Sequence, residues 1–150
     1  MRPVMIALIQ RVSEAQVRVG GEVVGAIGRG VLALIGVRRG DDDGAVERLL
    51  ERLLSYRVFA DREGRMNLSV REVGGGLLLV PQFTLAADTG KGTRAGFSTA
   101  AAPEEAQRLF ADLLGRAQAV YAPVSAGVFG AHMQVSLVND GPVTFLLTTR

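Results

Sequence analysis

Residues 31–54 read VLALIGVRRGDDDGAVERLLERLL, and this stretch decides the class of fold. It opens with a continuous apolar run over 31–37, which is typical of a strand buried on both faces. After the three aspartates at 41–43, the apolar residues recur at helical spacing, at Val46, Leu49, Leu50, Leu53 and Leu54. Acidic residues suit the positive end of a helix dipole. The stretch therefore predicts a buried strand and then an amphipathic helix, with the aspartates as its cap and a solvated turn.

The segments before this stretch predict antiparallel strands. Two strands are expected over Val4 to Val12 and Ala15 to Val19. Gly20-Gly21 then supplies a two-residue turn into a third strand over Glu22 to Ile27, which is a strong hairpin signal.

The segments after it predict a further strand, a second helix and a final strand pair. Leu77 to Leu85 is an apolar strand candidate, and Pro81 in its middle predicts an edge or a bulge at that point. Pro103 stands at the favoured first position of a helix. Strands over 132–138 and 143–148 flank Asn139-Asp140-Gly141-Pro142. No repeat, linker or low-complexity tract interrupts these elements, so we expect one mixed α/β domain over residues 1–150.

Composition excludes several kinds of site. The chain has no cysteine and one histidine, His132. We therefore expect no disulfide, no thiolate nucleophile and no metal centre built from Cys or His. The net charge of +2 does not indicate a strongly basic nucleic-acid-binding domain, although it suits a protein that contacts a few phosphates. No apolar run has the length of a secretory signal or a membrane span, so we expect a cytoplasmic protein.

Two glycine-rich segments resemble nucleotide-binding motifs, but neither meets the requirements of such a motif. Residues 28–33 match G-x-G-x-x-A, but they precede a strand, so no helix N-terminus can face a pyrophosphate. Gly90-Lys91-Gly92-Thr93 lacks the first glycine and the hydroxyl residue of a phosphate-binding loop. Lys91 and Arg94 could still contact phosphates. No serine triad is recognisable, because His132 has no evident partners.

Two longer segments carry a family resemblance. They are Val80-Pro81-Gln82-Phe83-Thr84-Leu85-Ala86-Ala87-Asp88-Thr89 and the region from Gly127-Val128-Phe129-Gly130-Ala131-His132-Met133-Gln134-Val135 through Asn139-Asp140-Gly141-Pro142-Val143-Thr144. Both resemble signatures of the D-aminoacyl-tRNA deacylases, enzymes that hydrolyse the ester between a D-amino acid and the 3′ end of tRNA. Residues 7–12 and 56–68 fit the same family, so the likeness spans essentially the whole chain in order.

The resemblance implies a three-layer α/β fold in which two β-sheets pack with two helices, without metal or cofactor. It also implies a homodimer in which a cis Gly141-Pro142 peptide of one chain enters the active site of the other. Gln82, Phe83 and Thr84 would be catalytic, with backbone N–H groups near Phe83 and Thr84 holding the ester carbonyl. The substrate-binding residues would be Phe129, Gly130, Ala131, Met133, Asn139, Gly141 and Pro142. His132 receives no catalytic role.

Chirality would be read by exclusion, because carbonyls of Gly141 and Pro142 would hold the α-amino group and leave no room for an L side chain. Such a site would accept many D-amino acids and also glycyl-tRNA. The terminal ribose 2′-hydroxyl would assist the hydrolysis.

Three alternatives stay open at this point. Asp140-Gly141 between alternating apolar runs is also a strong hairpin signal, independent of any active site. Pro81 replaces the serine that is usual in the family, so the chain could be an inactive tRNA-binding module. A third possibility is a hydrolase of a different small ester or amide on the same fold.

Overall fold

The computed structural model describes residues 4–149. Its larger sheet has six strands: β1 (Ile6–Val19), β2 (Glu22–Ile27), β3 (Gly30–Gly36), β6 (Gly76–Pro81), β7 (Val124–Ala126) and β8 (Gln134–Thr148). A second sheet consists of β4 (Phe59–Ala60) and β5 (Met66–Leu68). The helices are α1 (Asp43–Ser55), α2 (Val70–Val73), the 3₁₀ helix η1 (Phe83–Ala86) and α3 (Pro103–Val120).

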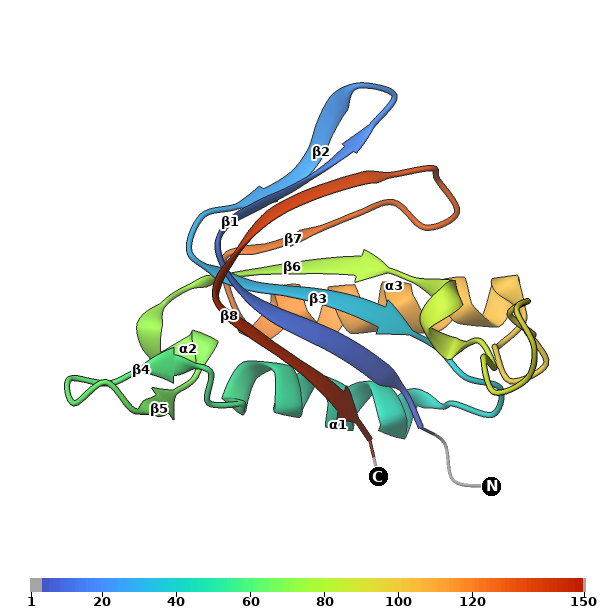
Figure 1. Cartoon of the computed structure of the whole chain (residues 1–150), viewed down its shortest axis with the longest axis horizontal. Coiled ribbons are helices and arrows are strands. Elements are labelled where there is room, and N and C mark those ends of the chain that lie inside the picture. Colours follow the sequence, from blue (N-terminus) through green and yellow to red (C-terminus); the bar gives the residue numbers. More distant parts are fainter. Residues whose placement is uncertain (1–3, 150) are drawn as a thin grey trace.

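The strand order in the larger sheet is β2-β1-β3-β6-β7, and β8 pairs with the other edge of β1. β3, β6 and β7 are parallel to one another, whereas β1 is antiparallel to β2, β3 and β8. Figure 1 shows α1 and α3 along one side of this sheet, while the β1–β2 hairpin and the first half of β8 rise away from the helices.

Side chains of the central strands alternate between two cores, as the two-residue repeat of a strand requires. Val31, Ala33 and Ile35 of β3 face the core that is shared with α1 and α3. Leu32 faces a second core, which contains Val12, Val17 and Ile27 from the β1–β2 hairpin. The prediction of a strand buried on both faces is thereby confirmed. The two cores separate the layers of the expected mixed α/β fold.

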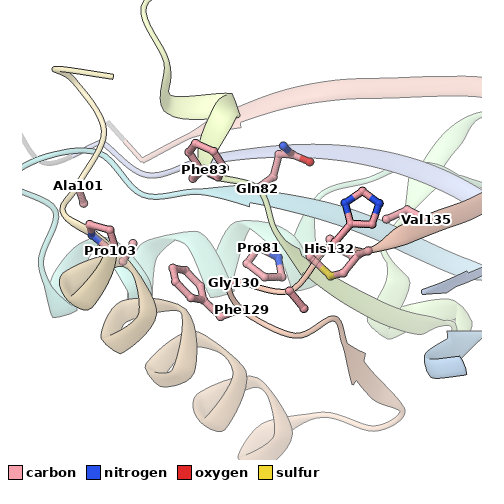
Figure 2. A pocket seen from close by; sticks show the side chains of 13 residues that line it. Pro81, Gln82, Phe83, Ala101, Pro103, Phe129, Gly130, His132 and Val135 are labelled. Carbon is pink, nitrogen blue, oxygen red and sulfur yellow. The ribbon is translucent and has the colours of Figure 1, made fainter. Parts of the chain in front are cut away.

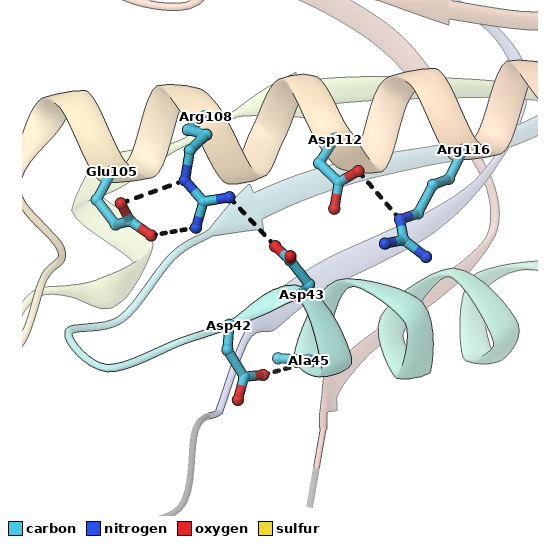
Figure 3. Close-up of polar contacts among 7 residues, drawn as sticks. All are labelled: Asp42, Asp43, Ala45, Glu105, Arg108, Asp112 and Arg116. Carbon is cyan, nitrogen blue, oxygen red and sulfur yellow. Dashed lines mark hydrogen bonds and ion pairs between the residues drawn. The ribbon is translucent and has the colours of Figure 1, made fainter.

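Two of the three aspartates, Asp42 and Asp43, have structural roles at the start of α1 (Figure 3), whereas Asp41, expected in a solvated turn, is buried. Asp42 is the N-cap, and its carboxylate accepts the Ala45 N–H at 2.9 Å. Asp43 forms an ion pair with Arg108 of α3 at 3.2 Å, and Arg108 also pairs with Glu105 at 2.6 Å. The predicted cap and helix are confirmed, and this cluster joins the two long helices at one end.

Several predicted boundaries are corrected. The strands expected over Val4 to Val12 and Ala15 to Val19 form the single strand β1, which pairs with β3 through its first half and with β2 through its second. The strand expected over Leu77 to Leu85 ends at Pro81, where the chain turns into η1. The short helix α2 was not anticipated from the sequence.

The hairpin interpretation of Asp140-Gly141 is wrong. β8 runs through residues 139–142 without reversing direction and stays antiparallel to β1 on both sides of them. A hairpin and a continuous strand would both show alternating apolar residues on either side of Asp140-Gly141. The two-residue repeat indicates a strand, but it does not indicate which strand it pairs with. Here the partner is β1, at the other end of the chain.

None of the helices within residues 4–149 is both long and apolar enough to cross a bilayer. Over the same residues, no group of three or more His, Cys, Asp or Glu side chains could hold a metal ion.

Candidate active site

A cavity of about 420 Å³ opens between the end of β6, the start of α3 and the segment that leads into β8 (Figure 2). Its lining is almost wholly apolar, and the polar side chains in it are those of Gln82 and His132. The lining residues are Val80, Pro81, Gln82, Phe83, Ala101, Pro103, Ala106, Phe129, Gly130, Ala131, His132, Met133 and Val135. An apolar cavity with few polar groups is typical of a small-molecule or nucleoside subsite.

The end of β6 forms the floor of the cavity. This strand lies between β3 and β7, but its pairing with β7 ends at Leu79, two residues before the end of β6 at Pro81. Alternate N–H groups of β6 point to β3 and to β7, and Gln82 N–H donates to the Ile35 carbonyl at 2.8 Å. The N–H that Pro81 lacks would point to the side of β6 where the pairing with β7 has already ended. The absence of that donor breaks no sheet hydrogen bond.

Gln82, Phe83 and Thr84 follow at the mouth of the cavity. The Gln82 amide donates a short hydrogen bond to the Thr84 hydroxyl. Within residues 4–149 the N–H groups of Phe83 and Thr84 donate to no protein acceptor, as expected at the start of a helix. Gln82 and Phe83 line the cavity, whereas Thr84 is exposed beside it. Two free backbone donors and an oriented hydroxyl can together stabilise a developing oxyanion.

The opposite wall comes from the turn between β7 and β8. Phe129, Gly130, Ala131 and Met133 all line the cavity. The Met133 sulfur lies 3.4 Å from the backbone nitrogen of Val128, which donates to it, and a Cβ on Gly127 would come within 2.7 Å of that sulfur. Glycine at 127 thus lets the thioether fold back against the turn and shape the cavity.

His132 also lines the cavity and is exposed at its rim, which the sequence did not reveal (Figure 2). It is the one histidine of the chain. Its place between Ala131 and Met133 was the available signal, because both neighbours were predicted to bind substrate.

Asn139, Gly141 and Pro142 lie outside this cavity, on a bulge of β8. Between two points of pairing with β1, β8 advances five residues, from Asn139 to Thr144, while β1 advances two, from Gln10 to Val12. The extra residues project from the sheet, and Gly141 and Pro142 are exposed. The Gly141-Pro142 peptide is cis, and Gly141 has a φ of 145°. The Asn139 side chain stabilises the bulge: it accepts the Val143 N–H at 3.2 Å and donates to the Thr144 hydroxyl at 2.9 Å.

Arg11 of β1 also stabilises this bulge, a role that was not predicted from the sequence. Its Nε donates to the Asp140 carbonyl at 2.9 Å, and its Nη1 donates to the Val58 carbonyl at 2.8 Å. The guanidinium also lies 3.7 Å from the Asp140 carboxylate. Its position could be found only from the pairing of β1 with β8.

A buried carboxyl, that of Asp41, lies in the turn between β3 and α1. Asp41 is 6% exposed, and its carboxylate accepts the Arg38 N–H at 2.6 Å. Burial raises the pKa of Asp41 to about 6, against the lowering effect of that hydrogen bond and of the Arg38 charge. The turn it holds pairs with the segment that ends at the cavity, since Arg39 N–H donates to Thr99 and Ala101 N–H donates to Val37.

Comparison with known proteins shows the family of the chain. A family model described as D-Tyr-tRNA(Tyr) deacylase matches residues 8–148. The D-aminoacyl-tRNA deacylase of Thioalkalivibrio sulfidiphilus is 66% identical over 143 residues, which are 95% of this chain and 96% of that protein. The D-aminoacyl-tRNA deacylase of Vibrio cholerae serotype O1 is 64% identical, over 95% of this chain and 99% of that protein.

Two solved structures share the fold. The c-Myc DNA unwinding element binding protein superposes with a TM-score of 0.90 at 39% identity, over 95% of this chain and 97% of that chain. A structure described as "a probable eukaryotic D-amino acid tRNA deacylase" superposes with a TM-score of 0.81 over 97% of this chain and 99% of that chain. Its 17% identity limits this second likeness to the fold. By the family match and the curated relatives, the chain belongs to the D-Tyr-tRNA(Tyr) deacylase family.

Proposed function

We propose that this chain hydrolyses the ester bond of D-aminoacyl-tRNA and releases free D-amino acid and tRNA, a proofreading step in translation. The observation that carries this proposal is the 66% identity, across 95% of the chain, to a protein named D-aminoacyl-tRNA deacylase. The apolar cavity with free backbone donors at its mouth is consistent with it.

The chemistry needs few side chains, because an aminoacyl ester is already reactive. Water adds to the ester carbonyl carbon, and the carbonyl oxygen becomes an oxyanion that the Phe83 and Thr84 N–H groups would stabilise. The bond to the ribose 3′ oxygen then breaks, and that oxygen takes up a proton. The Gln82 amide orients the Thr84 hydroxyl, which would position the ester or the water. The 2′-hydroxyl of the ribose would assist from the substrate.

In this proposal the cavity takes the terminal adenosine. A volume of about 420 Å³ has room for a nucleoside, and its lining offers apolar contact on several sides. Phe129, Gly130, Ala131 and Met133 would contact the base and ribose. Gln82 lies at the mouth, where the ester would emerge.

Asn139, Gly141 and Pro142 would act from a second copy of the chain. They do not line the cavity of their own chain, yet the bulge presents Gly141 and Pro142 to solvent on a braced support. In a homodimer each bulge would enter the cavity mouth of the other subunit, and its carbonyls would bind the α-amino group. An L side chain would then clash, while D-amino acids and glycine would fit. We infer a cytoplasmic homodimer formed by single domains of residues 1–150.

The test compares D-Tyr-tRNA and L-Tyr-tRNA hydrolysis by the purified protein with a no-enzyme blank and with the Thr84→Ala variant. Rapid loss of the D-ester alone supports the proposal. Tight binding of D-Tyr-tRNA with decay at the blank rate would instead identify an inactive tRNA-binding module. Hydrolysis of a free D-tyrosine ester at a rate matching that of the tRNA ester would indicate a general small-ester hydrolase.

A further inference from the structure

We propose that the exposed aromatic pair Phe83 and Phe97, together with Lys91 and Arg94, binds the unpaired nucleotides that precede the terminal adenosine of the tRNA. The four residues are called the aromatic–basic platform below. This inference rests on the proposed function and adds the part of the substrate that lies outside the cavity.

The aromatic pair is unusual in its exposure. The Phe83 side chain is 61% exposed and that of Phe97 is 47% exposed, whereas Phe59 and Phe110 are 1% and 5% exposed in the core. The rings of Phe83 and Phe97 contact each other, with centroids 5.4 Å apart and planes tilted by 42°. Phe83 also lines the cavity, so the pair extends the cavity wall outward to the surface.

The loop that carries Phe97 is held in place by its own backbone. Asp88 and Gly96 exchange two N–H···O hydrogen bonds of 2.8 Å, which close the loop over residues 88–96. The Thr99 hydroxyl donates to the Ala86 carbonyl at 2.7 Å and ties the loop to η1. Phe97 follows the closing pair directly, so the ring projects from a defined point on the loop.

The charge of this loop favours an anionic partner. Lys91 and Arg94 lie at its tip, are exposed, and form no ion pair within residues 4–149. The acidic residue of the loop is Asp88, whose carboxylate already accepts the Gly90 N–H at 2.9 Å. Two uncompensated cations beside two exposed rings match a flexible polyanion whose bases have aromatic faces.

Single-stranded nucleic acids are bound by this combination, because bases stack on aromatic rings and cations follow the backbone. With the terminal adenosine in the cavity, the preceding nucleotides must leave past its mouth. Phe83 lies at that mouth, and Phe97 lies beyond it. The platform therefore offers a stacking surface for one base and cations for the adjoining phosphates.

The experiment compares two substrates, D-Tyr-tRNA and the D-tyrosyl ester of adenosine, which lacks the preceding nucleotides. For each, kcat/KM is measured with the wild type and with the Phe97→Leu, Phe97→Tyr and Val120→Ala variants. We expect Phe97→Leu to lower the ratio of kcat/KM on tRNA to kcat/KM on the adenosine ester by roughly tenfold, the effect of losing one stacked base. Phe97→Tyr should keep the ratio within about twofold. Val120→Ala, which truncates an exposed apolar side chain on α3, should not change it.

A second variant tests the cations. Lys91→Gln with Arg94→Gln should make log KM for D-Tyr-tRNA less dependent on log salt, by about 0.7 for each phosphate contact that is lost. The thermal unfolding midpoint of every variant shows whether it is folded.

The outcomes separate the two proposals. If the wild type hydrolyses neither substrate, the proposed function fails. If it hydrolyses both and Phe97→Leu leaves the ratio unchanged, the platform proposal is overturned and the function stands. A Phe97→Leu protein that dissociates into monomers in sedimentation, with the ratio unchanged, would assign the rings to a contact between subunits and would also overturn it.

Discussion

The cavity at the end of β6 and the bulge in β8 are built from different kinds of contact. The cavity forms where a parallel strand ends and its neighbours on either side have different lengths, so its walls come from short segments close to β6. The bulge depends on pairing with β1 and on Arg11, more than a hundred residues away in the sequence. One region is complete within a single chain, while the other presents its predicted binding residues to solvent.

This difference shows that two parts of the second signature region, although close in sequence, need not line the same cavity. Residues 129–133 line the cavity, and residues 139–142, only a few positions further along β8, do not. A strand advances about 3.3 Å per residue, which is enough to carry the second segment out of the cavity that the first one lines. In the proposed homodimer, a site that uses both segments would take the second one from another copy of the chain.

The substitution Gly141→Ala should have the largest effect, and it tests the difference between the cavity and the bulge. At Gly141, φ is 145° and a Cβ would lie 2.6 Å from Val143 Cγ2, so the bulge has to shift. We expect kcat/KM for D-Tyr-tRNA to fall by about 100-fold or more, as displaced positioning groups do. Gly130→Ala in the cavity wall has φ 79° and open space at Cβ, so it should cost less, and Gly20→Ala in the remote hairpin should leave kcat/KM unchanged. Equal losses at 130 and 141 would contradict the distinction between the two regions.

The next prediction concerns the buried carboxyl of Asp41 and the pH dependence of the free energy of unfolding. Its folded pKa of about 6 lies above the usual 3.8, so between about pH 4 and 6 the folded state holds a proton that the unfolded state has released. The contribution of Asp41 therefore destabilises the fold progressively as pH rises through this window, and the cost is fully present above it. Asp41→Asn should remove this slope. The difference in unfolding free energy between wild type and variant should change by on the order of 2–3 kcal/mol between pH 4 and 7. Urea unfolding at several pH values measures it, and parallel curves for the two proteins would refute the assignment.

Thr84 distinguishes backbone from side-chain chemistry at the cavity mouth. If the Phe83 and Thr84 N–H groups stabilise the oxyanion, Thr84→Ala removes one oriented hydroxyl and should lower kcat by about tenfold, as the loss of one hydrogen bond does. Thr84→Ser keeps the hydroxyl that accepts from Gln82 and should retain most of the activity. Complete loss of activity in Thr84→Ala, with the fold intact by circular dichroism, would instead indicate a nucleophilic threonine.

Pro81→Ser should have the smallest effect. The nitrogen of Pro81 lies on the side of β6 where β7 has ended, so a restored N–H gains no partner in the sheet. We expect kcat/KM for D-Tyr-tRNA to change by less than about threefold, and the free energy of unfolding by less than about 0.5 kcal/mol. A large gain in kcat would show that the serine usual in the family takes part in the chemistry.

The elements that could be predicted from the sequence are those with local signals. The cap at Asp42, the turn at Gly20-Gly21 and the start of α3 at Pro103 each depend on neighbouring residues, and each is confirmed. Of the predicted site residues, the cavity contains Gln82, Phe83, Phe129, Gly130, Ala131 and Met133. Their grouping followed from family resemblance, since no spacing rule joins residue 82 to residue 129.

The rest depended on long-range pairing. Asp140-Gly141 looks like a hairpin until β1 is known to lie beside it, and β1 itself looked like two strands until its change of partner from β3 to β2 was seen. The role of Arg11 was missed for the same reason, because it becomes visible only when distant segments are placed together. The roles assigned to the site residues stay predictions until they are tested.

The pairing of β1 with β8 also has a consequence for synthesis on the ribosome. β1 is complete at Val19, but its partner begins at Gln134, so roughly 110 residues separate them. At about 5–20 residues per second, one edge of β1 stays without its strand partner for roughly 6–20 seconds in the nascent chain. Unpaired strand edges invite aggregation. The native sheet is therefore completed only after β8 has been synthesised, and until then one edge of β1 is open to non-native pairing.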